Sequence, residues 1–487
     1  MKKKILALLL AALMMFSVLT ACGNDPDPKP SNAGNAGDNG DTTVDLGNFT
    51  VPEGGYDGSE VTITFYHTMG AAIRNVLELY IEEFNKIYPN IHIEHEQVGS
   101  YDDVRDQISK EITVGNQPNI AYCYPDHVAL YNITGAVTAL DSLIESDVTV
   151  THADGTTEIL GLTDEQKADF IEGYYNEGKQ FGDGLMYTMP LSKSTEVLYY
   201  NVDFFKEHEL KIPTTWDEME AVCEQIKKID PKCIPLGYDS SANWFITMCE
   251  QSGSPYTSAT GDHFLFNNET NQAFVKRFND WFQKGYVITQ DLYGTYTSEL
   301  FKGNDEKAKS YMCIGSSAGA AHQRPAANPD GSYPFEVGIT TIPQVDPSNP
   351  KVISQGPSVC IFQKENPQEV IASWLFVKFL TTNVDFQVEF GLGSSGYMPV
   401  IKSAMEHPVF ADKLSKADGG NNVTALVIKV AMAQEAAYYT SPAFNGSSTA
   451  RDQVGFLMNA CLPMTGDVDK QIAKAFEDAV DECEYMS

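Results

Sequence analysis

Residues 61–98 read VTITFYHTMGAAIRNVLELYIEEFNKIYPNIHIEHEQV, and this stretch decides the fold. Its first six residues are all β-branched or aromatic, which predicts a strand over 61–66. Apolar residues then recur at helical spacing over 73–87, and Pro89 ends that helix. The alternation over 91–98 predicts a second strand. Strand, helix and strand with short connections are typical of a parallel sheet covered by helices.

The second predicted strand contains histidines and glutamates at a spacing that resembles a metal site. On a strand, however, His92, Glu94 and Glu96 share one face, whereas His95 lies on the other face with two isoleucines. This is the ordinary pattern of a strand with one polar and one apolar face. We therefore predict no metal site here.

The α/β alternation continues to the end of the chain. A helix is expected over 102–113 and a third strand over 119–124. Residues 215–218 form a capping box, and Asn366 precedes a proline at a first helical position, so both predict helix starts. The last helix is expected over 467–482, with its apolar residues on one face. No second linker interrupts this pattern, which predicts interleaved lobes.

Composition supports a large folded protein with two lobes. The chain has 487 residues, which exceeds the size at which a single core usually stops growing. A hydrophobic content of 43% with 11% aromatic residues supports a real core. A formal charge of −33 argues against nucleic acids and anionic membrane surfaces as partners, because both would repel the chain.

The chain has nine cysteines, and no two of them form a C-x-x-C pair. Neither a zinc ribbon nor a thioredoxin-type redox site is therefore indicated. The eight cysteines after Cys22 are scattered, and most stand in apolar runs, so we expect small core residues. No Gly-rich loop followed by Lys-Ser or Lys-Thr is present, so an ATPase of the P-loop type is not indicated.

The N-terminus has the features of a secretory signal. Three lysines precede an apolar run over residues 5–18, and Leu19, Thr20 and Ala21 stand directly before Cys22. This ending resembles the lipobox of bacterial lipoproteins, in which the cysteine is diacylated and becomes the N-terminus. The alternative is an ordinary signal peptide with an incidental cysteine.

The composition changes sharply after Cys22. Residues 24–47 are almost all small or polar, which predicts a flexible tether. No later stretch reaches about 18 uninterrupted apolar residues, so lipid alone is expected to attach the protein to a membrane.

Five phrases of the sequence resemble a known family in their order and spacing. They are Phe65-Tyr-His-Thr-Met-Gly70, Gly115-Asn-Gln-Pro-Asn-Ile120, Ser194-Thr-Glu-Val-Leu-Tyr-Tyr-Asn-Val-Asp203, Thr215-Trp216 and Gly396-Tyr-Met-Pro-Val400. The chain resembles the family 1 extracellular solute-binding proteins of bacterial ABC importers, most closely the receptors for sn-glycerol 3-phosphate and sugars. The resemblance covers nearly all of the chain after the tether.

This resemblance implies an α/β fold of the periplasmic-binding-protein-like type II. Two α/β lobes are joined by a hinge that the chain crosses several times, and the ligand binds in the cleft between them. The crossings are expected near residues 189–195, 338–343 and 393–397. The implied parts are a lipoprotein signal peptide over 1–22, a tether over 23–58, an N-terminal lobe over 59–190 and 340–395, and a C-terminal lobe over 191–339 and 396–487.

Ligand-contacting residues also follow from the resemblance. The matching positions are Tyr101, Ser194, either Ser316 or Ser317, Gly356 and Tyr397. The acidic residue that the family carries after the third strand matches either Pro125 or Asp126, and Asp126 is the chemically sensible choice.

One departure from the family pattern bears on the ligand. Glycerol-phosphate receptors offer an arginine where this chain has Ala443, Phe444 and Asn445, and Arg451 is close by but out of register. A phosphate ester is expected to prefer a bidentate arginine. A neutral saccharide is therefore the favoured ligand.

Aromatic residues suit a sugar, because a pyranose has apolar faces and a polar rim. Trp244 follows a loop-like run, so both core packing and cleft contact remain open for it, whereas the other three tryptophans lie on apolar helix faces and are expected in the core. The candidate platforms are Tyr66, Tyr101, Tyr124, Trp244, Tyr397, Tyr438 and Tyr439.

A hydrolase hypothesis arises from residues 315–319, which fit the G-x-S-x-G pattern of nucleophile elbows after a plausible strand. Such a site needs an acid and then a histidine downstream. Only His322 and His407 follow, and His322 is close along the chain. Serines at a helix start in a binding cleft explain the same residues as hydrogen-bond donors. Carboxylates for a glycosidase are present, but no spacing selects a pair.

We therefore predict a lipid-anchored receptor on the outer face of the cell membrane of a Gram-positive type bacterium. It is expected to act as a monomer, to capture a mono- or oligosaccharide without a cofactor, metal or catalysis, and to deliver it to the permease of an ABC transporter. A receptor for glycerol 3-phosphate or another polar solute is the first alternative. A secreted hydrolase is the second.

Overall fold

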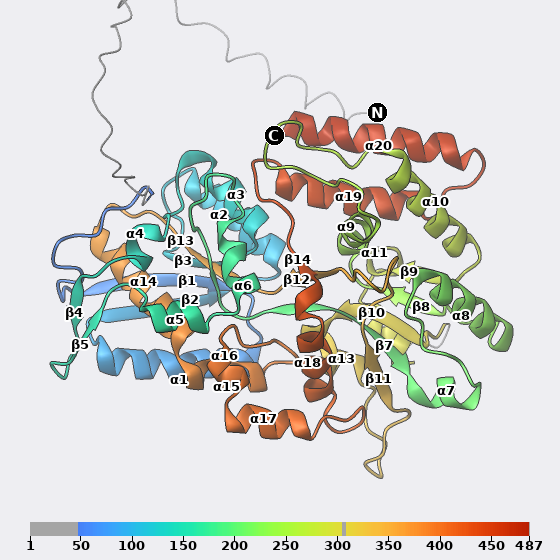
Figure 1. Cartoon of the computed structure of the whole chain (residues 1–487), viewed down its shortest axis with the longest axis horizontal. Helices are drawn as coiled ribbons and strands as arrows, with labels where there is room; N and C mark the ends of the chain where they lie inside the picture. The colour runs from blue at the N-terminus through green and yellow to red at the C-terminus, as the bar shows by residue number, and fades with distance from the viewer. Residues whose placement is uncertain (1–46, 304–307, 487) are drawn as a thin grey trace, which may run out of the picture. The chain divides into compact units, whose positions relative to one another are not determined.

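The computed structural model describes residues 47–303 and 308–486, which all belong to one compact unit formed by residues 45–487. The predicted signal peptide, Cys22 and residues 24–46 of the predicted tether lie outside the described residues. Within the described part of the chain, no helix is both long and apolar enough to cross a membrane. Two sheets organise the unit, and helices lie against both of them (Figure 1).

The first sheet has five strands in the order β2-β1-β3-β13-β6. Both β2 and β3 run parallel to β1, as the sequence predicts, while β13 is antiparallel to β3 and β6 is antiparallel to β13. Alternation on β2 also follows the prediction, because the side chains of His92, Glu94 and Glu96 are exposed. The strand bounds are β1 (Val61–His67), β2 (Ile91–Gln97), β3 (Ile120–Cys123), β6 (Met189–Pro190) and β13 (Ser358–Ile361).

Three predicted helices cover this sheet, namely α1 (Ala71–Ile87), α2 (Tyr101–Ile112) and α14 (Pro367–Thr382). Asn366 caps α14 and is followed by proline, as predicted. The rings of Phe84 and Phe376, from α1 and α14, pack edge to face with their centroids 5.1 Å apart.

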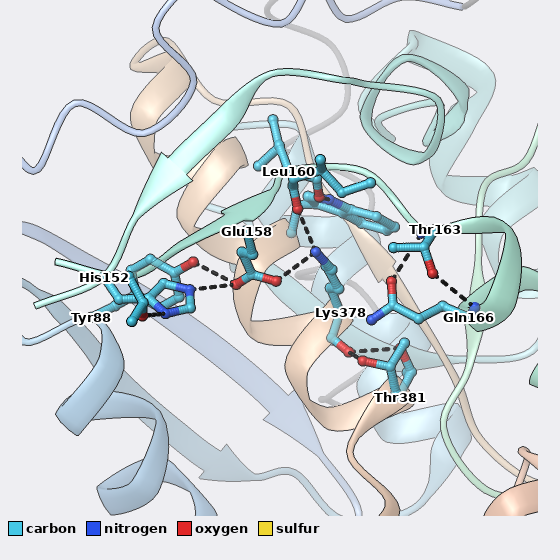
Figure 2. A network of polar contacts seen from close by, with 12 residues as sticks. Tyr88, His152, Glu158, Leu160, Thr163, Gln166, Lys378 and Thr381 are labelled. Atoms are coloured by element: carbon cyan, nitrogen blue, oxygen red, sulfur yellow. Dashed lines mark hydrogen bonds and ion pairs between the residues drawn. The ribbon is translucent and has the colours of Figure 1, made fainter. Parts of the chain in front are cut away.

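A short hairpin, β4 (Thr149–Thr151) and β5 (Thr157–Ile159), contacts α14 through one partly buried carboxylate (Figure 2). Glu158 accepts hydrogen bonds from Tyr88 Oη at 2.7 Å and from Lys378 Nζ at 2.7 Å. Trp374 Nε1 donates to the Leu160 carbonyl at 2.8 Å. These contacts fasten β5 to α14 and to the residue that ends α1.

The second sheet has seven strands in the order β14-β12-β7-β10-β8-β9, with β11 also paired to β7. Parallel β8 and β9 extend it beside β10, and β7 runs antiparallel to β10, β11 and β12. The bounds are β7 (Ser194–Asn201), β8 (Leu236–Tyr238), β9 (Val287–Thr289), β10 (Met312–Ser316), β11 (Val337–Thr340), β12 (Val352–Gln355) and β14 (Tyr438–Tyr439).

Helices pack around this sheet and build its core. Thr215 caps α8 with the predicted capping box. Counting both sheets, Trp216, Trp281 and Trp374 are all buried, and so are all eight cysteines after Cys22, which have free thiols. Both expectations for the core are confirmed. The helices around this sheet include α8 (Trp216–Ile229), α9 (Ser241–Ser252), α10 (Glu269–Gln283), α18 (Val423–Ala433), α19 (Ser447–Cys461) and α20 (Val468–Met486).

The folded unit begins earlier than the sequence predicts. Residues 48–58 were expected in the tether, but the side chain of Asn48 donates to the Val137 carbonyl at 2.8 Å and accepts from the Ala139 N–H at 2.9 Å. Phe49 is buried in the core, and Tyr56 packs against it. The assignment of residues 48–58 to the tether is therefore wrong, because their aromatic side chains have a core to enter.

The chain passes from one sheet to the other at points that the structure locates. It leaves β6 in the first sheet and enters β7 in the second between residues 190 and 194, within the predicted first crossing. The second crossing, expected near 338–343, is not there, because β11 and β12 both belong to the second sheet. The chain returns after β12 instead, where it enters β13.

Gly356 occupies this return. Its φ of +101° is unfavourable for other residues, and an added Cβ would lie 2.8 Å from the Lys193 Cα of the first crossing. Lys193 in turn pairs with Met398, next to the predicted third crossing over 393–397. The strands that connect the two sheets therefore lie side by side at Lys193.

Candidate ligand-binding site

A cavity of about 500 Å³ lies where strand ends of the two sheets meet. We call it the wide chamber. Tyr101 at the start of α2 and Tyr124 after β3 come from the first sheet. Glu196 on β7, Asp239 after β8 and Ser316 at the end of β10 come from the second. Loops beyond strand ends are free to carry recognition groups, which is why ligand sites of α/β sheets lie there.

One wall of the wide chamber is aromatic and consists of Tyr101, Tyr124 and Tyr397. The rings of Tyr101 and Tyr124 stack with centroids 4.6 Å apart, and the hydroxyl oxygens of Tyr101 and Tyr397 are 3.5 Å apart. Burial raises the pKa of Tyr101 well above its ordinary value, so this phenol stays neutral at physiological pH. The aromatic wall therefore offers ring faces with neutral hydroxyl groups.

A second part of the lining, the polar wall, centres on Glu196, which lies buried on β7. Its carboxylate accepts hydrogen bonds from Tyr238 Oη at 2.8 Å and from Asn243 Nδ2 at 3.1 Å. Burial raises the pKa of Glu196 to about 7 despite these two hydrogen bonds. The Glu196 carboxyl group therefore holds its proton to a higher pH than an exposed glutamate does.

Asp239 is the second carboxylate of the polar wall. Thr297 holds its Oδ1 through the backbone N–H at 2.9 Å and the hydroxyl group at 2.7 Å, and burial raises its pKa. A Cβ at Gly315 would lie 2.6 Å from Asp239 Oδ2. Any side chain larger than glycine at position 315 would therefore displace the Asp239 carboxylate. Beside it, Gln323 is buried, and its Oε1 has no hydrogen-bond partner.

A second, smaller cavity of about 60 Å³ shares Tyr124 and Gln355 with the wide chamber, and we call it the deep chamber. Asp126 and Arg451 line it. Arg451 donates a hydrogen bond to Asn243 Oδ1, and Asn243 Nδ2 also donates to Gln355 Oε1 at 3.0 Å. An amide network therefore links Glu196 in one chamber to Arg451 in the other.

Five of the predicted contacting residues line these chambers. Tyr101, Ser194, Ser316 and Tyr397 line the wide chamber, and Asp126 lines the deep one. The structure thus brings together side chains that are up to about 300 residues apart along the chain. Their contact with a ligand remains a prediction.

Trp244 lines neither chamber and is fully buried. The expectation of a loop-like context is wrong, because Ser240 caps helix α9 and Trp244 lies in its first turns. Its ring stacks on Tyr238 with centroids 4.8 Å apart, in the core behind the polar wall. Trp244 therefore packs against Tyr238, which donates a hydrogen bond to Glu196 in the polar wall.

Three further candidates also lie outside both chambers. Tyr66 donates to Glu111 Oε1 at 3.4 Å, away from the cavities, and Gly356 packs against the first crossing. Ser317 is fully buried. Its hydroxyl group donates to the Gly396 carbonyl at 3.2 Å and accepts from the Thr195 N–H at 3.2 Å. Of the two serines that match the family position, Ser316 is thus the one in the chamber.

The bonds of Ser317 bear on the hydrolase hypothesis. In a nucleophile elbow the serine hydroxyl is exposed and hydrogen-bonded to a histidine. Both hydrogen-bond partners of the Ser317 hydroxyl group are backbone atoms. One of them is the carbonyl of Gly396, so this bond fixes the loop that carries Tyr397. Across residues 47–303 and 308–486, no group of three or more His, Cys, Asp or Glu side chains is placed to hold a metal ion.

Sequence reasoning missed Glu196, Asp239, Asn243 and the position of Arg451. A usable signal existed for Glu196, because it is the one charged residue in the run 194–199, whose other residues are apolar, aromatic or hydroxyl-bearing. Asp239 directly follows a short apolar strand, which is where recognition groups of α/β sheets are expected. Arg451 gave no such signal, because its approach to Tyr124 depends on how α19 packs.

Residues 80–417 match the family model described as bacterial extracellular solute-binding protein. The match spans more than half of the chain. The chain belongs to this family. The resemblance to extracellular solute-binding proteins is therefore confirmed.

Curated relatives include receptors from enteric bacteria. The sn-glycerol-3-phosphate-binding periplasmic protein UgpB of Salmonella typhimurium is 24% identical over 363 residues, which cover 71% of this chain and 75% of that protein. The protein of the same name from Escherichia coli K12 is 24% identical over 364 residues, with the same coverage.

Solved structures show the same fold. A cyclic alpha-maltosyl-1,6-maltose binding protein from Arthrobacter globiformis aligns with a TM-score of 0.65 and 18% identity, over 87% of this chain and 99% of that chain. UgpB from Mycobacterium tuberculosis in complex with glycerophosphocholine aligns with a TM-score of 0.67 and 16% identity, over 88% and 98%. The predicted type II periplasmic-binding-protein-like fold is confirmed for this family member.

Proposed function

We propose that this protein is the substrate-binding lipoprotein of an ABC importer and that it captures a mono- or oligosaccharide in the wide chamber. The single observation that carries this proposal is the pairing of two different walls. Stacked tyrosines, Tyr101 and Tyr124, line the same chamber as the carboxyl, amide and hydroxyl groups around Glu196 and Asp239. A sugar ring matches both, because its faces are apolar and its edge carries hydroxyl groups.

The charge of the lining supports a neutral ligand. Carboxyl groups of Glu196, Asp239 and Glu299 line the wide chamber. An anion would meet repulsion from these groups. Related structures support the same choice, since they include a cyclic alpha-maltosyl-1,6-maltose binding protein, a maltose-bound receptor and a receptor in complex with cycloalternan.

A receptor for glycerol 3-phosphate is the second candidate. Arg451 supports it, because this arginine lines the deep chamber although it is out of register in the sequence. Curated relatives of the name UgpB support it as well. Against it stands the engagement of Arg451, which donates to Asn243 and faces Asp126.

A thermal-shift screen separates the two candidates. Saccharides are expected to raise the melting temperature, because a ligand that binds only the folded state stabilises it by mass action. Glycerol 3-phosphate and other polyol phosphates are expected to have no effect. Stabilisation by phosphates and by no sugar would contradict the saccharide proposal.

Binding without catalysis is part of the proposal. Family membership supports it. The Ser317 hydroxyl group also bonds to two backbone groups, which is a structural role. Turnover of a chromogenic ester or glycoside that is lost on Ser317→Ala would support a hydrolase instead.

Attachment by lipid on Cys22 completes the proposal, with the protein held as a monomer on the outer face of a single membrane of Gram-positive type. An anchor and tether would keep the receptor at high effective concentration beside its permease. Cys22→Ala is expected to release a protein that still binds its ligand but no longer supports uptake. Retained membrane attachment of this variant would contradict the lipid anchor.

A further inference from the structure

The deep chamber gathers buried polar groups whose bonding capacity is unused. Five of its lining side chains each carry a buried atom without a hydrogen-bond partner, and these atoms are Glu177 Oε2, Tyr256 Oη, Thr257 Oγ1, Ser354 Oγ and Ser441 Oγ. Unsatisfied buried polar groups destabilise a protein, so folded proteins keep few of them. Their concentration around one cavity calls for a partner that is polar.

Glu177 is the clearest example of a side chain with an unused hydrogen-bond acceptor. It is almost fully buried, and its Oε1 accepts from Lys193 Nζ at 2.6 Å and from Ser358 Oγ at 3.4 Å. Lys193 therefore balances its charge, whereas Oε2 remains free to accept a hydrogen bond.

Charges around the deep chamber are balanced. Two carboxylates, Asp126 and Glu177, face two cations, Arg451 and Lys193. An anion or a cation would gain little from such a lining. Hydroxyl groups both donate and accept hydrogen bonds, so they suit four free side-chain hydroxyls and one free carboxylate oxygen.

The position of the chamber indicates which molecule supplies these hydroxyl groups. Tyr124 and Gln355 line both chambers, so a ligand that lies in the wide chamber along Tyr124 ends beside the deep one. A volume of about 60 Å³ is room for about four water-sized groups. It therefore suits the hydroxyl-bearing edge of one further sugar unit.

We propose that the deep chamber is a second subsite, which takes the hydroxyl-bearing edge of a terminal sugar unit while the rest of an oligosaccharide lies in the wide chamber. This inference rests on the proposed function and sharpens it, because it makes the ligand longer than one sugar unit.

The test uses a double variant, Tyr256→Phe with Thr257→Val, which removes two unpartnered hydroxyl groups at nearly constant shape. Its matched control is Tyr131→Phe with Thr138→Val, because these residues also carry buried unpartnered hydroxyl groups but line neither chamber. Calorimetric titrations use glucose, galactose and xylose, and the di- and trisaccharides built from them.

For the sugar series that binds, the wild-type protein is expected to bind the disaccharide at least about tenfold more tightly than its monosaccharide. In the test variant this ratio is expected to fall about tenfold, with an unchanged or raised melting temperature, because no bond of the free protein is lost. The control is expected to keep the wild-type ratio.

An unchanged ratio in the test variant would overturn the subsite. A lowered melting temperature with an unchanged ratio would show that ordered water alone fills the chamber, which also overturns it. Absence of binding by every saccharide would overturn the proposed function and the subsite together, so the two failures are distinguishable.

Discussion

The aromatic wall and the polar wall of the wide chamber are built in different ways. Tyr101 and Tyr124 reach the chamber from a helix start and a loop and are held by stacking on each other. Glu196 and Asp239 are fixed by hydrogen bonds from Tyr238, Asn243 and Thr297. Stacking offers contact area without direction, whereas the fixed carboxylates set direction. We therefore expect the tyrosines to supply affinity and the carboxyl groups to select among sugars.

The largest effect is expected from protonation of the polar wall. Glu196 has a pKa of about 7 in the folded protein against about 4.5 when unfolded. The folded state therefore binds the proton more tightly, so the stability from this group is present below pH 4.5 and is lost as pH rises through 7. This shift in pKa corresponds to a change in the free energy of unfolding on the order of 3 kcal/mol between low and high pH.

Unfolding by urea at pH 5 and pH 8 measures this difference. Glu196→Gln is expected to remove it from the pH profile, while Tyr101→Phe is expected to leave the profile unchanged, since the pKa of Tyr101 is raised far above this range. Parallel pH profiles for the wild type and Glu196→Gln would show that Glu196 is not the titrating group.

A large effect is also expected from the aromatic wall. Tyr397→Ala removes a ring and the hydroxyl group beside Tyr101, so saccharide affinity should fall by about 2 kcal/mol, roughly thirtyfold. Calorimetric titration measures it, and circular dichroism should show an intact fold. Tyr66→Phe is the control, because its hydroxyl group bonds to Glu111 outside the chamber. Unchanged affinity of Tyr397→Ala would remove this residue from the site.

A methyl group can test the polar wall sterically. In Gly315→Ala the added Cβ would lie 2.6 Å from Asp239 Oδ2 and displace the carboxylate, so affinity should fall about tenfold. Gly319→Ala is the matched control, because Gly319 lines the same chamber and its Cβ would meet nothing within 4 Å. Equal affinities of the two variants would show that Asp239 does not contact the ligand.

The smallest effect is expected from an ion pair between α2, which covers the first sheet, and α19, which packs around the second sheet. Arg105 Nη1 on α2 lies 3.1 Å from Asp452 Oδ2 and 3.2 Å from Ser448 Oγ on α19. Arg105→Met should lower affinity about twofold to threefold, and less at high salt, because a partly exposed ion pair contributes about 1 kcal/mol or less. Lys474→Met, which breaks an exposed pair with Asp478, should have no effect. A loss that is independent of salt would contradict an ionic contribution.

How much could be predicted from sequence differs between the two walls. The strands and helices over 61–124 followed from periodicity, and Tyr101 and Tyr397 followed from the resemblance to the family. The polar wall was missed because its carboxylates become a site only when β7, β8 and β10 lie side by side. Trp244 was misplaced because its loop-like neighbours prove to be the cap and first turn of α9. The second crossing was misplaced because β11 pairs with β7 rather than returning to the first sheet.

A crystal structure of the complex with the saccharide that gives the largest thermal shift is the decisive test of sugar binding in the wide chamber. We expect a sugar ring against Tyr101, Tyr124 or Tyr397, with its hydroxyl groups within hydrogen-bond distance of Glu196 and Asp239. A ligand bound outside the wide chamber, or a sugar that contacts neither carboxylate, would contradict it.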